Sequence, residues 1–104
     1  MTPAADLEIN GGVGRLTLRG EIDLTVVPEL AAVLDRARDG HVKSLEVDLA
    51  LVDFLDSSGL GFIAQAAAAL EDVRIVAAPI SVVRIFEMTG LGSLIALGSG
   101  SDGS

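Results

Sequence analysis

Two adjacent serines stand where the chain has its strongest potential for chemistry, in the segment Asp56-Ser57-Ser58-Gly59-Leu60-Gly61. An apolar, strand-like run precedes this segment and a helix-like run follows it. The first backbone N–H groups of a helix have no partner inside the helix, and the helix dipole is positive there. An anion is therefore favoured at this place, and a phosphate on one hydroxyl would add a charge of about −1.5 to −2. The segment favours a switch over a catalytic centre.

Two enzymatic interpretations of this segment fail on spacing. A G-x-S-x-G nucleophile elbow needs glycine two residues before the serine, where this chain has Leu55 or Asp56. Residues 59–64 match the G-x-G-x-x-A pattern of a dinucleotide loop, but residues 76–79 supply no acid for the ribose. The only histidine, His41, is expected in an exposed turn, where it would meet a serine only by chance. We therefore expect a protein that is not an enzyme and has no cofactor.

A metal site is a further interpretation, because Asp48, Asp53 and Asp56 could approach one another near a strand end. They lack the spacing of an EF-hand loop, and the chain has no cysteine and no second histidine. Solvated carboxylates around a turn, and no bound metal, are the better prediction, although weak association of Mg²⁺ stays open.

A phosphoserine site remains, in which Ser57 or Ser58 works with the N–H groups of Gly59, Leu60 and Gly61. Serine is, however, a common N-cap, and Asp-Ser-Ser-Gly is a common turn composition. These residues alone therefore favour a simple helix cap, and only the wider pattern of the chain can overturn that interpretation.

The strands that must position this segment are predicted from alternating or short apolar runs. Residues 13–22 alternate clearly, with Leu16 and Leu18 on one face and charged or polar residues on the other. The predicted strands are residues 7–9, 13–22, 45–49 and 73–78, and residues 94–97 form either a last strand or a helical turn.

The helices are predicted from apolar stripes at helical spacing. Thr25 is expected to cap the first, which should end with Gly40 as the residue after its C-cap. The second follows the serines as far as Leu70, and the third begins at a cap on Ser81 and ends at Gly90. Strands and helices alternate after an initial hairpin, which predicts an α/β sandwich with helices over one mixed sheet of four to five strands.

Composition sets the broad class of the protein. The chain has 104 residues, half of them hydrophobic, and a net charge of −8. We expect one domain over residues 1–97 and a flexible Gly/Ser tail over residues 98–104. The charge argues against nucleic acid and anionic lipid as partners, and no leader or membrane span is recognisable. A cytoplasmic protein with a protein partner is expected.

Four ordered segments of the chain resemble the STAS domain, and within it the stand-alone bacterial anti-sigma factor antagonists. Residues 18–23, Leu-Arg-Gly-Glu-Ile-Asp, look like the family's second-strand signature, and residues 45–49 look like its central strand. Residues 52–61 are similar to its most specific motif, and residues 84–91 resemble its third helix. The resemblance covers nearly the whole chain except the tail.

The resemblance implies that the unphosphorylated chain binds an anti-sigma factor, which then releases its sigma factor. The anti-sigma factor is often a Ser/Thr kinase that phosphorylates the antagonist, and a Ser/Thr phosphatase resets it. The family's phosphorylated serine directly precedes glycine, which is Ser58 here, with Ser57 as its structural neighbour. The implied partner-binding residues are Asp23, Asp56, Ser57, Gly59 and Leu60. The alternative is a non-phosphorylated STAS adaptor or scaffold of a transport or signalling complex.

Overall fold

The computed structural model describes residues 3–95. Its first two strands, in which apolar and polar residues alternate, are β1 (Ala5–Asn10) and β2 (Val13–Ile22). The two strands pair antiparallel, so they form the expected hairpin. Gly11 adopts a φ of +58° in the turn between them, a conformation that glycine reaches without strain. The β2 strand has the bounds predicted from its pattern, because its alternation places one face in the core.

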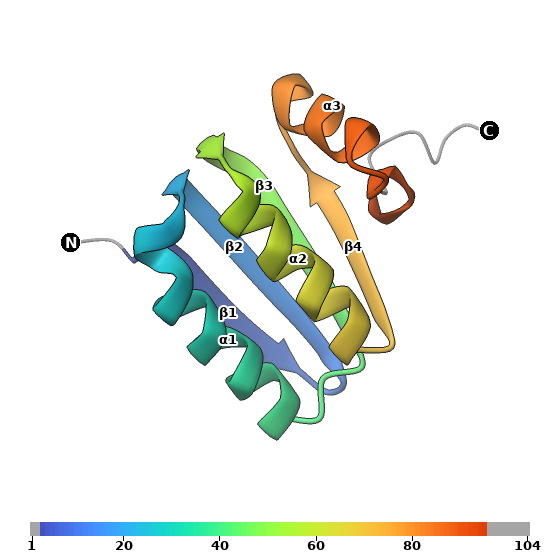
Figure 1. Cartoon of the computed structure of the whole chain (residues 1–104). Helices are drawn as coiled ribbons and strands as arrows, with labels where there is room; N and C mark the ends of the chain where they lie inside the picture. Colours follow the sequence, from blue (N-terminus) through green and yellow to red (C-terminus); the bar gives the residue numbers. More distant parts are fainter. Residues whose placement is uncertain (1–2, 96–104) are drawn as a thin grey trace.

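Two further strands, β3 (Ser44–Leu55) and β4 (Asp72–Ala77), complete a sheet in the order β1-β2-β3-β4. The β3 strand is parallel to both β2 and β4, so the sheet is mixed, as predicted, with four strands in the described part of the chain. Parallel strands need a crossover connection, which is usually a helix. Here α1 (Val27–Asp39) joins β2 to β3, and α2 (Ser57–Ala69) joins β3 to β4 (Figure 1).

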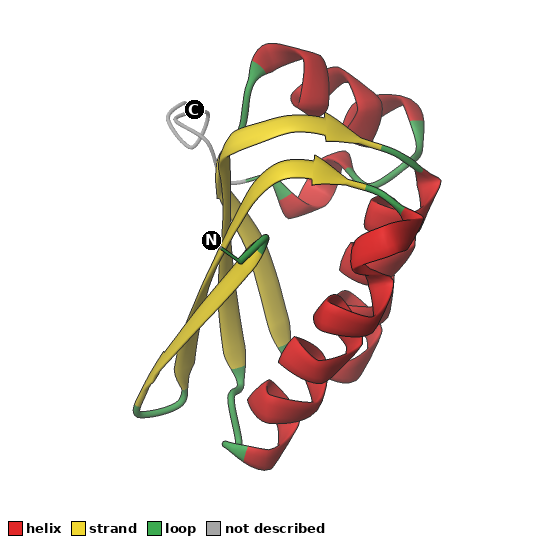
Figure 2. Ribbon diagram, turned by 90° about the vertical axis from the view of Figure 1, so that its left-hand side faces the viewer, coloured by secondary structure: helices red, strands yellow, loops and turns green. Residues whose placement is uncertain are grey.

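The helices α1 and α2 cover one face of the sheet (Figure 2). Their apolar stripes supply Leu30, Val33, Phe62, Ile63 and Ala66 to a core in which, among residues 3–95, no polar side chain is buried. The other face of the sheet carries a row of alternating charges, because the register aligns Glu8, Arg15, Glu46 and Arg74 across the four strands. Opposite charges in neighbouring positions stabilise such a solvated face modestly.

The start of the first helical segment differs from the prediction that Thr25 caps it. A 3₁₀ turn, η1 (Leu24–Val26), precedes α1, and its N-cap is Asp23. The Asp23 carboxylate accepts from the backbone N–H of Thr25 at 3.0 Å and also from the Thr25 hydroxyl. Thr25 is therefore a donor to the cap rather than the cap, because the chain turns two residues earlier than its apolar stripe suggests.

The end of α1 also corrects a prediction. Gly40 is the C-cap itself, with a φ of −82°, and the left-handed residue is His41, with a φ of 57°. The N–H of Val42 donates to the carbonyl of Ala37 at 2.9 Å, and the N–H of His41 donates to that of Arg38 at 3.0 Å. These two bonds form a Schellman motif, so His41 ends the helix and has a structural role.

The third helix, α3 (Ile80–Met88), begins directly after Pro79, and no side chain caps it. Ser81 lies inside its first turn, so the prediction that Ser81 is the N-cap is wrong. Gly90 follows the helix with a φ of +82°, as predicted. A 3₁₀ turn, η2 (Gly92–Leu94), comes next, and Ile95 forms an isolated parallel bridge with Ile75. The predicted tail at residues 98–104 lies outside the described residues.

Candidate functional site

The carboxyl ends of β2 and β3 bring the predicted site residues to one edge of the sheet. The backbone N–H of Asp56 donates to the carbonyl of Ile22 at 3.2 Å, so the two strand ends are joined at their last residues. Asp23 directly follows β2, and the segment 56–60 directly follows β3. The structure therefore gathers Asp23 and the serine segment at the same edge, where the second helix starts (Figure 1).

Asp56 is the N-cap of α2. Its Oδ1 accepts from the backbone N–H of Ser58 at 2.8 Å and from that of Gly59 at 3.3 Å. Its carbonyl accepts from the N–H of Leu60 at 3.1 Å. Ser57 is consequently the first residue of the helix and not its cap. The expectation that Gly59 and Leu60 offer free N–H groups to an anion is also wrong, because Asp56 already uses both.

Removing the Asp56 carboxylate should destabilise the fold without touching the core. Asp56→Ala leaves two N–H groups of the first helical turn without their acceptor, which should lower the free energy of unfolding by about 1 kcal/mol. Asp56→Asn keeps an acceptor oxygen at the cap and should retain most of the stability. Urea denaturation followed by circular dichroism compares the two variants, and equal losses would contradict the capping role.

The two serines differ in accessibility. Ser57 is exposed, whereas Ser58 is half-buried in the first turn of α2. A partner that reaches Ser58 must therefore approach the strand ends closely. Leu60 is half-buried against the core, and Leu55 and Phe62 are buried within it, as their apolar character predicts.

Gly59 is buried and packs closely on the ends of β3 and β2. A Cβ on Gly59 would lie 2.4 Å from Cδ1 of Leu55, 3.1 Å from its Cγ, and 3.0 Å from Cγ2 of Ile22. Any side chain here would overlap two buried residues. The first glycine of the apparent dinucleotide motif thus serves helix–strand packing, whereas Gly61 has no atom within 4 Å of such a Cβ.

Acidic side chains surround this edge of the sheet. Residues 20–35 and 44–73 contain no lysine or arginine, and they carry Glu21, Asp23, Asp53 and Asp56. A group with further negative charge on Ser58 would meet the carboxylate of Asp56, two residues earlier, which already uses the N–H groups of Ser58 and Gly59. The edge is therefore suited to a basic partner and poorly suited to a second anion.

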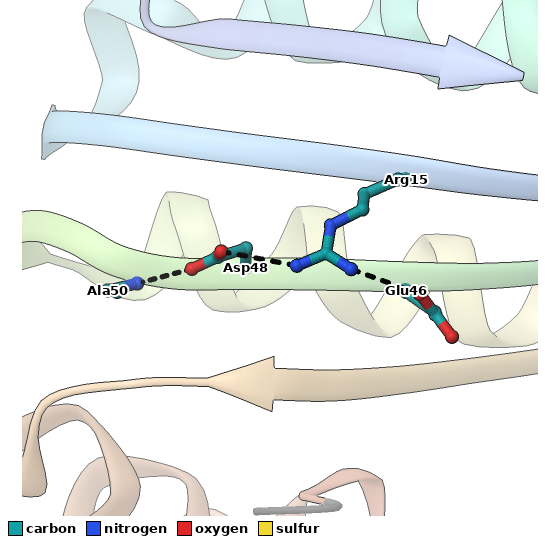
Figure 3. A network of polar contacts seen from close by, with 4 residues as sticks. All are labelled: Arg15, Glu46, Asp48 and Ala50. Atoms are coloured by element: carbon teal, nitrogen blue, oxygen red, sulfur yellow. Dashed lines mark hydrogen bonds and ion pairs between the residues drawn. The ribbon is translucent and has the colours of Figure 1, made fainter.

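Asp48, which the sequence grouped with Asp53 and Asp56, is engaged elsewhere (Figure 3). Its carboxylate accepts from the backbone N–H of Ala50 at 2.9 Å and pairs with Arg15 at 3.6 Å. Arg15 also contacts Glu46 at 3.4 Å. Among residues 3–95 no group of three or more potential metal ligands is found.

No helix in the same part of the chain is long and apolar enough to cross a bilayer.

Comparison with known proteins agrees with the resemblance. The family model described as "Mlab, STAS domain" matches residues 5–96. The anti-sigma-B factor antagonist of Staphylococcus aureus is 33% identical over 87 residues, which are 80% of this chain and 81% of that protein.

Two solved structures share the architecture. The anti-sigma factor antagonist SpoIIAA in its unphosphorylated form has a TM-score of 0.79 and 23% identity over 90% of this chain and 87% of its own, a likeness of fold. An anti-sigma factor antagonist from Mycobacterium paratuberculosis has a TM-score of 0.77 and 28% identity, covering 89% of this chain and 82% of its own.

Proposed function

This chain belongs to the STAS domain family, and we propose that it acts as an anti-sigma factor antagonist whose binding is switched off by phosphorylation of Ser58. The curated relative with 33% identity bears that functional name, and the match spans most of both chains. In this role the protein binds a partner and catalyses no reaction. The unphosphorylated chain engages an anti-sigma factor, which then releases its sigma factor.

The observation that carries the switch is the occupied cap of α2. A phosphoryl group on Ser58 would normally be stabilised by free N–H groups at a helix N-terminus. Here the Asp56 carboxylate already accepts from Ser58 and Gly59, so these two N–H groups are not free to stabilise the added charge. The charge instead faces the partner, where desolvation and repulsion raise the free energy of the complex.

The proposed switch needs two enzymes, one that adds the phosphate and one that removes it. The anti-sigma factor is a Ser/Thr kinase that uses Ser58 as its substrate, and a Ser/Thr phosphatase removes the phosphate. Because such a kinase depends on ATP, the cycle takes place in the cytoplasm. The acidic edge favours a kinase surface with basic side chains around the catalytic cleft.

Phosphorylation can be tested directly. The chain is incubated with ATP and each purified kinase-type anti-sigma factor of its own organism, and the products are mapped by mass spectrometry. We expect one phosphate, on Ser58, in the wild type and in Ser57→Ala, and none in Ser58→Ala. A phosphate confined to Ser57, or no phosphate with any of these kinases, would overturn the proposed switch.

A second candidate function is a STAS adaptor that uses the same surface permanently. The matching family model carries the description "Mlab, STAS domain", a name that differs from that of the antagonists. An adaptor needs no modification of Ser58. The same incubation separates the two functions, because an adaptor would bind its complex without acquiring a phosphate.

A further inference from the structure

The distal half of β3 contains two extra residues relative to β2. Thr17 pairs with Asp48 and Arg19 with Leu51, so one extra residue lies between Asp48 and Leu51. A second lies between Val52 and Phe54, because Gly20 pairs with Val52 and Glu21 with Phe54. The first bulge is held by the bond from the Ala50 N–H to the Asp48 carboxylate (Figure 3). Bulges of this kind redirect side chains.

Their effect is to turn two large apolar side chains out of the core. Leu45, Val47 and Leu49 alternate into the core along the proximal half of β3, after which the buried residues are Val52 and Leu55. Leu51 and Phe54 are left 57% and 53% exposed. The other two phenylalanines, Phe62 and Phe86, are buried, so Phe54 is the exposed aromatic side chain of the described chain.

Leu51 and Phe54 lie on a two-stranded part of the sheet that ends next to the segment containing Ser58. The β4 strand pairs with β3 only over residues 44–48, and the distal half of β3 pairs with residues 19–22 of β2. We call residues 19–22 and 51–55 the distal ribbon. It ends directly before Asp56, so Phe54 lies four residues before Ser58 in the chain.

The residue types of the distal ribbon indicate which kind of partner surface would bind it. Exposed aromatic residues near the centre of a surface, with polar residues around them, are typical anchors of protein interfaces. Two of the three charged residues of the ribbon are acidic: Glu21 is paired to Phe54 across the ribbon, and Asp53 is next to Phe54 in the chain. The third, Arg19, is paired to Leu51. A complementary surface has an apolar pocket with basic side chains at its rim.

We propose that Phe54, with Leu51 beside it, is the apolar anchor by which this chain docks into a pocket of the anti-sigma factor. The inference rests on the proposed function and adds the residues that supply affinity. Phe54 contacts the partner whether or not Ser58 is phosphorylated, and the phosphate on Ser58 weakens the complex by repulsion. Truncating Phe54 should weaken binding even when Ser58 is unmodified.

The test compares Phe54→Ala with a matched truncation at the other end of the sheet. Val13, the first residue of β2, is 44% exposed and lies away from the distal ribbon. Isothermal titration with the purified kinase-type anti-sigma factor should give a Kd at least about tenfold higher for Phe54→Ala than for wild type. Val13→Ala should bind like wild type, and Phe54→Leu should recover part of the loss.

Stability and modification provide independent readings. Because Phe54 is half-exposed, its truncation should leave the Tm close to that of wild type. Phosphorylation of Ser58 in Phe54→Ala should be slow at low chain concentration and should recover at saturating concentration, as expected when docking alone is weakened.

The outcomes separate the anchor from the function on which it rests. If wild type binds and Phe54→Ala binds equally well, the anchor is overturned and the antagonist function stands. If wild type binds no anti-sigma factor of its organism, both the proposed function and the proposed role of Phe54 are overturned. A loss of the same size in Val13→Ala would also overturn the anchor, since the effect would not be local.

Discussion

Ser58→Asp should bind the anti-sigma factor about a hundredfold more weakly than Ser58→Ala, a difference of about 2.7 kcal/mol. The reason is the arrangement at the start of α2, where Asp56 already occupies the N–H groups of Ser58 and Gly59. A second carboxylate at this position cannot use those two N–H groups and must be desolvated against the partner. Surface plasmon resonance with immobilised anti-sigma factor measures both affinities.

The matched control for this experiment is Ser57→Asp. Ser57 is exposed and precedes Ser58 in the same turn, so it adds the same charge to the same edge of the molecule. We expect it to weaken binding much less than Ser58→Asp. Similar losses in the two variants would mean that net charge at the edge, rather than position 58, controls the complex.

Gly59→Ala should lower the free energy of unfolding by about 2 kcal/mol, although alanine is the better helix former. A methyl group at this position overlaps the buried side chains of Leu55 and Ile22, with its closest approach at 2.4 Å. Relief requires Leu55, which is 3% exposed, to leave its rotamer or α2 to move away from the strand ends. Chemical denaturation by guanidinium gives the difference.

Gly61→Ala is the natural comparison, because it makes the same change two residues later in the same helix. No atom lies within 4 Å of the added methyl group, so the helix propensity of alanine should raise the stability by about 0.5–1 kcal/mol. Opposite signs for the two variants are the expected result. If Gly59→Ala were also stabilising, the close packing of α2 on Leu55 would be contradicted.

The sequence predicted the layer architecture well, because a strand or helix that buries one face has apolar residues at a regular spacing. The alternation of residues 13–22 and the apolar stripe through Leu30, Val33 and Ala37 each indicated the correct element. The distal half of β3 could not be predicted in the same way. Its two bulges break the period after Leu49, and their pairing with β2 is a long-range feature that no local pattern contains.

Caps were harder to assign than elements. Asp56, Ser57 and Ser58 are all residue types that cap helices, and the choice among them depends on where the helix begins. At that start Gly59 packs on Ile22 of the neighbouring strand β2, a tertiary contact that no local pattern contains. Asp23 and Thr25 posed the same ambiguity, and Asp23 forms the cap because η1 begins before the apolar stripe of α1.

The residues of the candidate site were predicted from motif resemblance, and the structure adds their positions. Asp23, Asp56 and the two serines come from neighbouring strand ends, as the parallel pairing of β2 and β3 requires. The exposed side chains of Leu51 and Phe54 were missed. The interrupted alternation Leu49-Ala50-Leu51-Val52 was the available signal, but it is equally typical of a strand that has ended.

Displacement of a sigma factor is the most direct test of the proposed switch. A preformed complex of labelled sigma factor and anti-sigma factor is mixed with the unphosphorylated chain or with the chain phosphorylated on Ser58. Fluorescence anisotropy then reports the released sigma factor. We expect release by the unphosphorylated chain and none by the phosphorylated chain at the same concentration. Equal release by both forms, or release by neither, would contradict the switch.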